Sequence, residues 1–302
     1  MKCGPYLKLT VFIVLFFSFL PGGCWAGESN TQDDGKRIRN TPHPHKKLPG
    51  MSSENRLKYE MNFDYFKGFL ADTAHIVTSP LRYNSSDWMK VAVVLGTTGI
   101  LLAVDEDAQD FFQRNKSSTT DKISDWFEPL GRADIQAPVL GGLYLVGAFL
   151  DNDKLKRVSL LSLETFGITA LLTTGVKRLS GRRRPLSDKQ EFAWRGPSFS
   201  SKNTSFPSGH TSSMFAIATT ISLEFPEEPL VSILAYTTAG LTSFARLNDN
   251  EHWVSDAFFG ACLGYFISKT VMKLHSDNKG HHFTIYPNVN RQTAGLTFNL
   301  RY

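Results

Sequence analysis

The sequence predicts an all-α protein, a helical bundle of about six core helices that ends in a short C-terminal β-hairpin or edge strand. Six apolar stretches have the length of helices, whereas the alternating pattern of a strand occurs only near the end. The 302 residues are 41% hydrophobic and 12% aromatic, which is enough for a substantial core. The apolar stretches cover residues 91–104, 135–150, 158–176, 211–225, 230–244 and 254–272.

The chain begins with the pattern of a secretory signal peptide, which we assign to residues 1–26. Lys2 and Lys8 precede an apolar run over residues 9–20, and small residues then lead to Ala26 before a cleavage point. The run is short for a membrane span, which argues against the alternative of an uncleaved anchor. The sequence therefore predicts secretion across the inner membrane.

A polar lead separates this signal from the bundle. Residues 27–58 are rich in Asn, Asp and Lys and predict a flexible segment. From Tyr59 onward, aromatic residues such as Phe63 and Phe66 recur at helical spacing and predict an amphipathic helix. This helix either lies on a membrane surface or packs on the bundle. The pattern as a whole predicts a helical domain over residues 59–275.

The sequence leaves open whether the helices cross a bilayer. The first two apolar stretches are short, and Glu164 interrupts the third. If the helices span, the positive-inside rule places the basic loop over residues 177–202 in the cytoplasm, whereas a signal peptide places it outside. Either the arginines of this loop bind an anion and override the rule, or the bundle lies against the membrane without spanning it. We favour the second interpretation.

The last predicted segment covers residues 276–302. Leu296, Phe298 and Leu300 alternate with polar residues, and Phe283 begins a matching run before a turn. This pattern predicts a β-hairpin or edge strand that packs on the bundle.

Composition argues against several classes of protein. The formal charge of +5 falls to +3 when Lys2 and Lys8 leave with the signal, and no long basic run with aromatic residues occurs, so no nucleic-acid partner is expected. Three cysteines are too few for a disulfide framework. The acidic run at residues 105–107 predicts a solvated helix end and no metal site.

Residues 206–210, Phe-Pro-Ser-Gly-His, predict the first turn of a helix and an anion-binding site. Ser208 can cap the helix, and the unpaired N–H groups behind it can bind an anion. Gly209 lets the backbone approach a bound group closely, and His210 places a titratable ring beside it.

Two further motifs flank this turn. Lys177 is followed after six residues by Arg184 and a proline, and Arg246 is followed after five residues by His252 and after three more by Asp256. This set resembles the type 2 phosphatidic acid phosphatase family, which shares its fold and anion site with bacterial class A acid phosphatases and vanadium haloperoxidases. One position differs, because Ala245 stands where the family has serine before the arginine.

The expected topology brings the three motifs together. Lys177 ends the third core helix and His210 opens the fourth, so both lie at one end of an antiparallel pair. Arg246 ends the fifth core helix and His252 opens the sixth, which places them at the same end. We therefore expect a single pocket.

Side chains alone can supply the charge that such a pocket needs for phosphoryl transfer, so no metal and no cofactor are expected. Ser208 and the N–H of Gly209 would complete a phosphate cradle. His252 and Asp256 are four residues apart, so the carboxylate can hold the far nitrogen of a histidine nucleophile. The resemblance implies that His252 forms a phosphohistidine, that Asp256 orients it and that His210 protonates the leaving oxygen. The cations of the cradle would be Lys177, Arg184 and Arg246.

The sequence therefore predicts an extracytoplasmic phosphatase that hydrolyses phosphomonoesters or diphosphates, with lipid phosphates among its candidate substrates. The expected location is periplasmic or membrane-associated, with the active site outside the cytoplasm and a membrane surface or bilayer as partner. A haloperoxidase with vanadate as cofactor is the first alternative, because vanadate mimics the transferred phosphoryl group. A catalytically silent phosphate-binding protein is the second.

Overall fold

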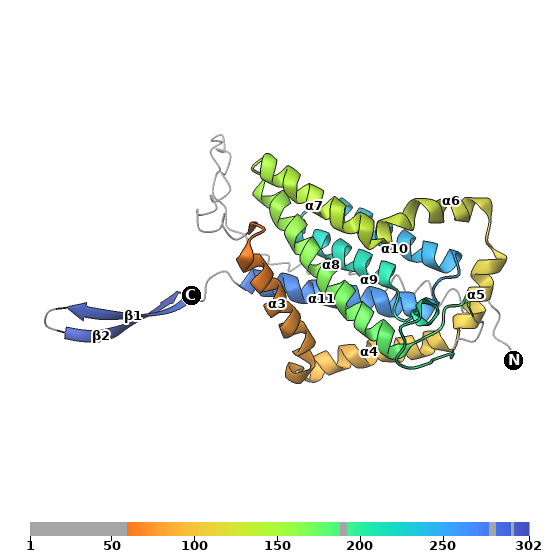
Figure 1. Cartoon of the computed structure of the whole chain (residues 1–302), viewed down its shortest axis with the longest axis horizontal. Coiled ribbons are helices and arrows are strands. Elements are labelled where there is room, and N and C mark those ends of the chain that lie inside the picture. Colours follow the sequence, from red (N-terminus) through yellow and green to blue (C-terminus); the bar gives the residue numbers. More distant parts are fainter. Residues whose placement is uncertain (1–58, 188–191, 278–281, 291–292, 302) are drawn as a thin grey trace, which may run out of the picture. The chain divides into compact units, whose positions relative to one another are not determined.

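The computed structural model describes residues 59–187, 192–277, 282–290 and 293–301. Helices dominate these residues, so the predicted all-α class is confirmed (Figure 1). The α-helices of the described residues are α3 (Phe63–Val77), α4 (Ser85–Leu102), α5 (Asp105–Arg114), α6 (Ser118–Phe127), α7 (Ala133–Phe149), α8 (Asp153–Ser180), α9 (Gly209–Glu224), α10 (Pro229–Asn248) and α11 (Val254–Asp277).

The six expected core helices correspond to α4 and α7–α11, but α5 and α6 were not predicted. Both helices are short and polar, so they contain no apolar run of helical length. Their ends explain why they form nonetheless. The first turn of α5 is acidic, which suits the positive end of the helix dipole, and Ser117 caps α6 in a capping box with Thr120.

Helix α9 lies at the centre of the bundle and packs against α8, α10 and α11 (Figure 1). All its residues from Thr211 to Thr220 are buried, as expected of a helix with neighbours on every side. Hydroxyl pairs join the helices, such as Thr173 with Ser212 at 3.0 Å. On α11, a Cβ at Gly264 would lie 2.1 Å from the Ser212 carbonyl oxygen, so these backbones are in contact. This packing holds the N-terminus of α9 among the helices α8, α10 and α11.

Helices α8 and α10 are long and apolar enough to cross a membrane, and α4 with α5 would form a third span bent by 59°. Large apolar side chains remain exposed on α7, such as Phe149 at 89%. Glu164, which interrupts the third apolar stretch, is buried inside the bundle and contacts His275. Whether the bundle spans a membrane or lies against it stays a prediction.

Helix α3 begins at Phe63, where the side chain of Asn62 caps it. Phe69 packs on a buried cluster that includes Leu161 of α8 and Val271 of α11, whereas Phe63 and Phe66 are exposed. The amphipathic helix therefore packs on the bundle through one face.

The C-terminal part contains strands β1 (His282–Asn290) and β2 (Thr293–Arg301), paired antiparallel with His282 opposite Arg301. The expected packing of this segment on the bundle stays a prediction. The predicted signal peptide and the polar lead, residues 1–58, lie outside the described residues, and the domain boundaries stay predictions as well.

Candidate active site

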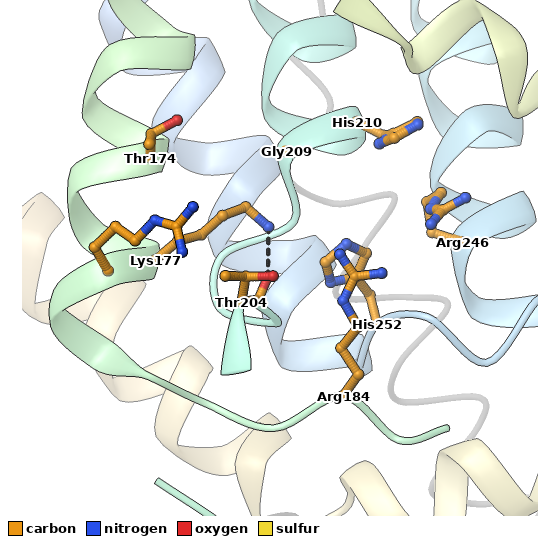
Figure 2. Close-up of a pocket in the computed structure, with 9 residues that line it drawn as sticks. Thr174, Lys177, Arg184, Thr204, Gly209, His210, Arg246 and His252 are labelled. Atoms are coloured by element: carbon orange, nitrogen blue, oxygen red, sulfur yellow. Dashed lines mark hydrogen bonds between the residues drawn. The ribbon is translucent and has the colours of Figure 1, made fainter. Parts of the chain in front are cut away.

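A pocket of about 290 Å³ opens where α8 ends and α9 begins (Figure 2). Six of the eight predicted site residues line it, namely Lys177, Arg184, Gly209, His210, Arg246 and His252. The other two, Ser208 and Asp256, are fully buried beside it. Three residues that the sequence did not single out also line the pocket, namely Thr174, Arg178 and Thr204.

Local structure explains why the motifs converge. Helix α8 carries Lys177 in its last turn, and its C-cap is Gly181, whose φ of +58° is left-handed. A Cβ at Gly181 would lie 1.8 Å from the Gly196 carbonyl oxygen, so only glycine fits this turn. Arg246 occupies the last turn of α10, and Gly209 is the first residue of α9.

Two details of the predicted geometry were wrong. Ser208 stands at the N-cap of α9 but makes no side-chain capping hydrogen bond, because its hydroxyl accepts one from Thr211 at 3.0 Å. His252 does not open a helix, since α11 begins at Val254. The carboxylate of Asp256 instead accepts a hydrogen bond from the N–H of Trp253, and its Oδ2 lies 3.7 Å from Nδ1 of His252. The side chains of His252 and Asp256 therefore meet across the start of α11, at the distance of an ion pair.

The pocket cations have partners that the sequence did not reveal. Nζ of the half-buried Lys177 donates a hydrogen bond to the Thr204 carbonyl oxygen at 2.7 Å (Figure 2). Arg184 pairs with Glu251, and Nη1 of Arg246 lies 3.1 Å from Oε1 of Glu128. A bound phosphate would compete with these carboxylates for the two guanidinium groups.

Glu128 also faces His210, for which the sequence offered no carboxylate nearby. Its Oε1 lies 3.2 Å from Nε2 of His210. The short 3-10 helix η3 (Pro129–Gly131) follows Glu128, and a Cβ at Gly131 would lie 2.5 Å from Cδ2 of His210. The absence of a side chain at Gly131 therefore lets this segment pack directly on the histidine ring.

A buried network holds Asp256 from behind. Arg182, with no exposed surface, donates to Asp256 Oδ1 at 2.6 Å and to Asp105 Oδ2 at 2.8 Å. Ser205 donates to Asp256 Oδ2 at 2.5 Å, and the N–H of Ser255 donates to Asp105 Oδ1 at 2.9 Å. The prediction of a solvated acidic helix end was therefore wrong for Asp105, which is fully buried and paired.

The surroundings of Asp256 and His252 give these two side chains different charge states. Burial raises the pKa of Asp256, but the charge of Arg182 and the neighbouring hydrogen bonds outweigh burial and lower the pKa to about 2. Burial lowers the pKa of His252 well below its usual value, and Lys177 and Arg246 lower it further against the opposing effect of Asp256. A neutral imidazole thus faces an ionised carboxylate.

His210 is held neutral in the free pocket. Burial and then the charges of Arg246, Lys177 and Arg184 lower its pKa to about 3. A phosphate dianion in the pocket would offset these charges and favour the protonated ring. His210 would then gain a proton only when the pocket holds an anion.

We expect inorganic phosphate to raise the pKa of His210 from about 3 towards neutrality. Histidine-selective NMR of isotope-labelled protein measures this, and the His210→Ala spectrum assigns the signal. The exposed His75, which does not line the pocket, is the internal control, because its signal should not respond to phosphate. A His210 titration that does not respond to saturating phosphate would contradict the described charge balance.

Comparison with known proteins decides the family. Residues 159–279 match the family model of the PAP2 superfamily. This part of the chain belongs to the PAP2 superfamily. The expected family is therefore confirmed, and the PAP2 region contains all eight predicted site residues.

A curated protein matches a shorter part of the chain. Over 89 residues, the chain is 37% identical to a lipid A 1-phosphatase of Porphyromonas gingivalis, a match that covers 27% of this chain and 19% of that protein. The chain thus matches only about a fifth of the length of this curated relative.

Two solved structures are also similar to the chain. A transmembrane PAP2-type phosphatidylglycerolphosphate phosphatase from Bacillus subtilis has a TM-score of 0.48 and 22% identity, covering 72% of this chain and 96% of that chain. LpxE from Aquifex aeolicus has a TM-score of 0.45 and 21% identity, covering 56% and 95%.

Proposed function

We propose that this protein is a phosphatase that hydrolyses phosphate monoesters or diphosphates through a phosphohistidine at His252. One observation supports this most strongly. A neutral, buried His252 lies between the ionised Asp256 and a pocket lined by Lys177, Arg184 and Arg246. Such a pocket suits a substrate with several anionic oxygens.

In the first step, the lone pair of His252 Nε2 forms a bond to phosphorus while the bond from phosphorus to the leaving oxygen breaks. Protonated His210 gives its proton to that oxygen. In the second step, neutral His210 takes a proton from water, the water oxygen bonds to phosphorus, and the bond to Nε2 breaks. Asp256 stabilises the positive charge that His252 carries in the intermediate, and Arg182 keeps Asp256 in position.

We propose a lipid phosphate as the substrate class. A pocket of about 290 Å³ is near the lower end of the range for ligand sites, so it holds the phosphoryl group while the rest of a lipid lies outside. Helices α8 and α10 are long and apolar enough to cross a membrane, and they carry Lys177 and Arg246 in their last turns. The pocket would then lie near the membrane surface, where lipid head groups are. The match to a lipid A 1-phosphatase supports this class.

We further propose that the pocket faces the periplasm, a location supported by the signal-like residues 1–26. The purified chain, in detergent, should be assayed on a lipid phosphate, a prenyl diphosphate and a soluble phosphomonoester. A lipid phosphatase should have the highest kcat/KM on a lipid-linked substrate. Equal or higher values on the soluble ester would reject the lipid class, and no hydrolysis of any of the three would count against the activity.

His210→Ala is expected to affect substrates according to their leaving group. With a lipid alkoxide of high pKa, kcat should fall by about 10²–10⁴-fold, as is typical when a general acid is lost. An activated aryl phosphate needs little protonation, so its phosphoenzyme should still form and then decay slowly. Single-turnover kinetics with both substrates measure this. Equal losses on both would mean that His210 does not act on the leaving group.

Phosphatase activity is expected to survive strong chelation, because the cations of the pocket are side chains. Initial rates should be equal before and after EDTA treatment, when assayed well below the unfolding temperature. A rate that disappears with EDTA and returns with a divalent ion would refute the metal-free mechanism.

A further inference from the structure

A second group of titratable side chains lies where α3, α8 and α11 meet. Asp72, Glu164 and His275 come from these three helices in turn. Nε2 of His275 lies 3.1 Å from Asp72 Oδ2 and 3.2 Å from Glu164 Oε2, and these three atoms lie within 4.8 Å of one another. We name this group the three-helix cluster.

The cluster is separate from the phosphatase pocket. Glu164 precedes Lys177 by 13 residues on α8, a distance of about 20 Å at 1.5 Å per residue. His275 follows Asp256 by 19 residues on α11, which is about 28 Å. The mechanism proposed for the pocket uses none of the three residues.

The hydrogen bonding of the cluster is incomplete. The side chain of Glu164 is only 1% exposed, and its Oε1 has no hydrogen-bond partner. Neither ring nitrogen of His275 makes a hydrogen bond, although two carboxylate oxygens lie close to Nε2. The oxygens are thus near the nitrogen without the alignment that a hydrogen bond needs. A buried carboxylate oxygen that lacks a hydrogen-bond partner is costly, so an additional group beside Oε1 of Glu164 is expected.

Charge balance indicates the nature of that group. If both carboxylates are ionised, a protonated His275 leaves one negative charge in the interior uncompensated. Two carboxylates, a neutral imidazole and a divalent cation sum to zero, which removes this cost. Other titratable groups beside the cluster are Tyr65, which is close enough to Glu164 for the two to interact electrostatically, and His75, which interacts in the same way with Asp72. Neither supplies a permanent positive charge.

The distances also suit a metal. Zinc binds imidazole nitrogen and carboxylate oxygen at about 2.0–2.2 Å, so two ligand atoms at a tetrahedral angle are about 3.3 Å apart. The observed 3.1 and 3.2 Å are close to this value. We propose that Asp72, Glu164 and His275 bind a divalent transition-metal ion, with Zn²⁺ as the expected occupant and water as the fourth ligand.

The ion would hold α3 on the bundle, because its ligands come from residues about 90 and 110 positions apart. No spacing motif could reveal such a set in the sequence. The expectation that no metal is needed concerned the phosphatase pocket, and a structural ion at the three-helix cluster leaves that chemistry unchanged.

The test uses the full chain without an affinity tag, stripped by a chelator and then dialysed against Zn²⁺. Elemental analysis should find about one Zn²⁺ per chain, and the unfolding temperature should rise by several degrees relative to the stripped protein. Glu164→Gln removes a ligand with little change of shape. It should weaken Zn²⁺ binding by at least about 100-fold, since even residues behind a ligand affect affinity by 10–100-fold.

Matched variants make the outcome decisive. His75→Asn changes an exposed histidine one turn from Asp72 and should keep both the zinc and the temperature shift. His252→Ala should also keep them, which separates this site from the pocket. If Zn²⁺ does not bind or shift the unfolding temperature of the unmodified chain, the cluster holds protons only and the proposal is wrong. Equal zinc binding by Glu164→Gln and by the unmodified chain would also overturn it.

Discussion

His252→Ala is expected to abolish turnover of every phosphate substrate, with a fall in kcat on the order of 10⁴–10⁶-fold, as for loss of a nucleophile. The reason is the site geometry. His252 is the histidine with an ionised carboxylate behind it, whereas His210 faces Glu128 and the pocket cations. Alanine at position 252 leaves the cations in place but offers phosphorus no nitrogen.

Steady-state assays on lipid and aryl phosphates measure this effect. Unlike His210→Ala, the His252→Ala variant should lose activity equally on the lipid and the aryl phosphate, because the nucleophile is required for either leaving group. The control is His75→Ala on α3, which should retain full activity. Residual activity of His252→Ala within about 100-fold of the unmodified chain would contradict a covalent role for His252.

Arg182→Met is expected to have the largest effect on stability, lowering the free energy of unfolding by about 3–5 kcal/mol. The guanidinium has no exposed surface and contacts the carboxylates of Asp105 and Asp256. Its removal leaves two buried carboxylates without their cation. Urea unfolding in detergent measures the loss.

Paired variants separate this effect from a simple packing defect. Adding Asp105→Asn to Arg182→Met removes one of the stranded charges and should restore part of the lost stability. The surface control Arg114→Met should change stability by less than about 0.5 kcal/mol. If Arg182→Met is as stable as the control, the buried network does not support the site as described.

The long apolar helices could be predicted because burial on several sides leaves an apolar run in the sequence. The convergence of the three motifs followed from counting helix ends, and Lys177, His210 and Arg246 do line one pocket. Helices α5 and α6 could not be found this way, since capping and the helix dipole stabilise them more than apolar periodicity does.

The partners of the site residues were also beyond the sequence. Asp105 has the sequence context of a solvated helix start, and only the fold places it against Arg182, 77 positions later. Glu128 is also distant from His210 in the sequence, and only the packing of Gly131 on the histidine ring brings the two together. Such pairings depend on long-range packing, for which neither spacing nor periodicity leaves a signal. The expected pairing of His252 with Asp256 is present, but the two residues do not lie on one helix, because α11 begins at Val254 and His252 precedes it.

The identity of the phosphorylated residue tests the central claim most directly. The enzyme would be mixed with a radiolabelled aryl phosphate, quenched within milliseconds in alkaline detergent, where phosphohistidine is stable, and mapped by peptide mass spectrometry. We expect label on His252 in the unmodified chain, slower loss of that label in His210→Ala, and no label in His252→Ala. Label on His210, or label that persists in His252→Ala, would contradict the assigned roles.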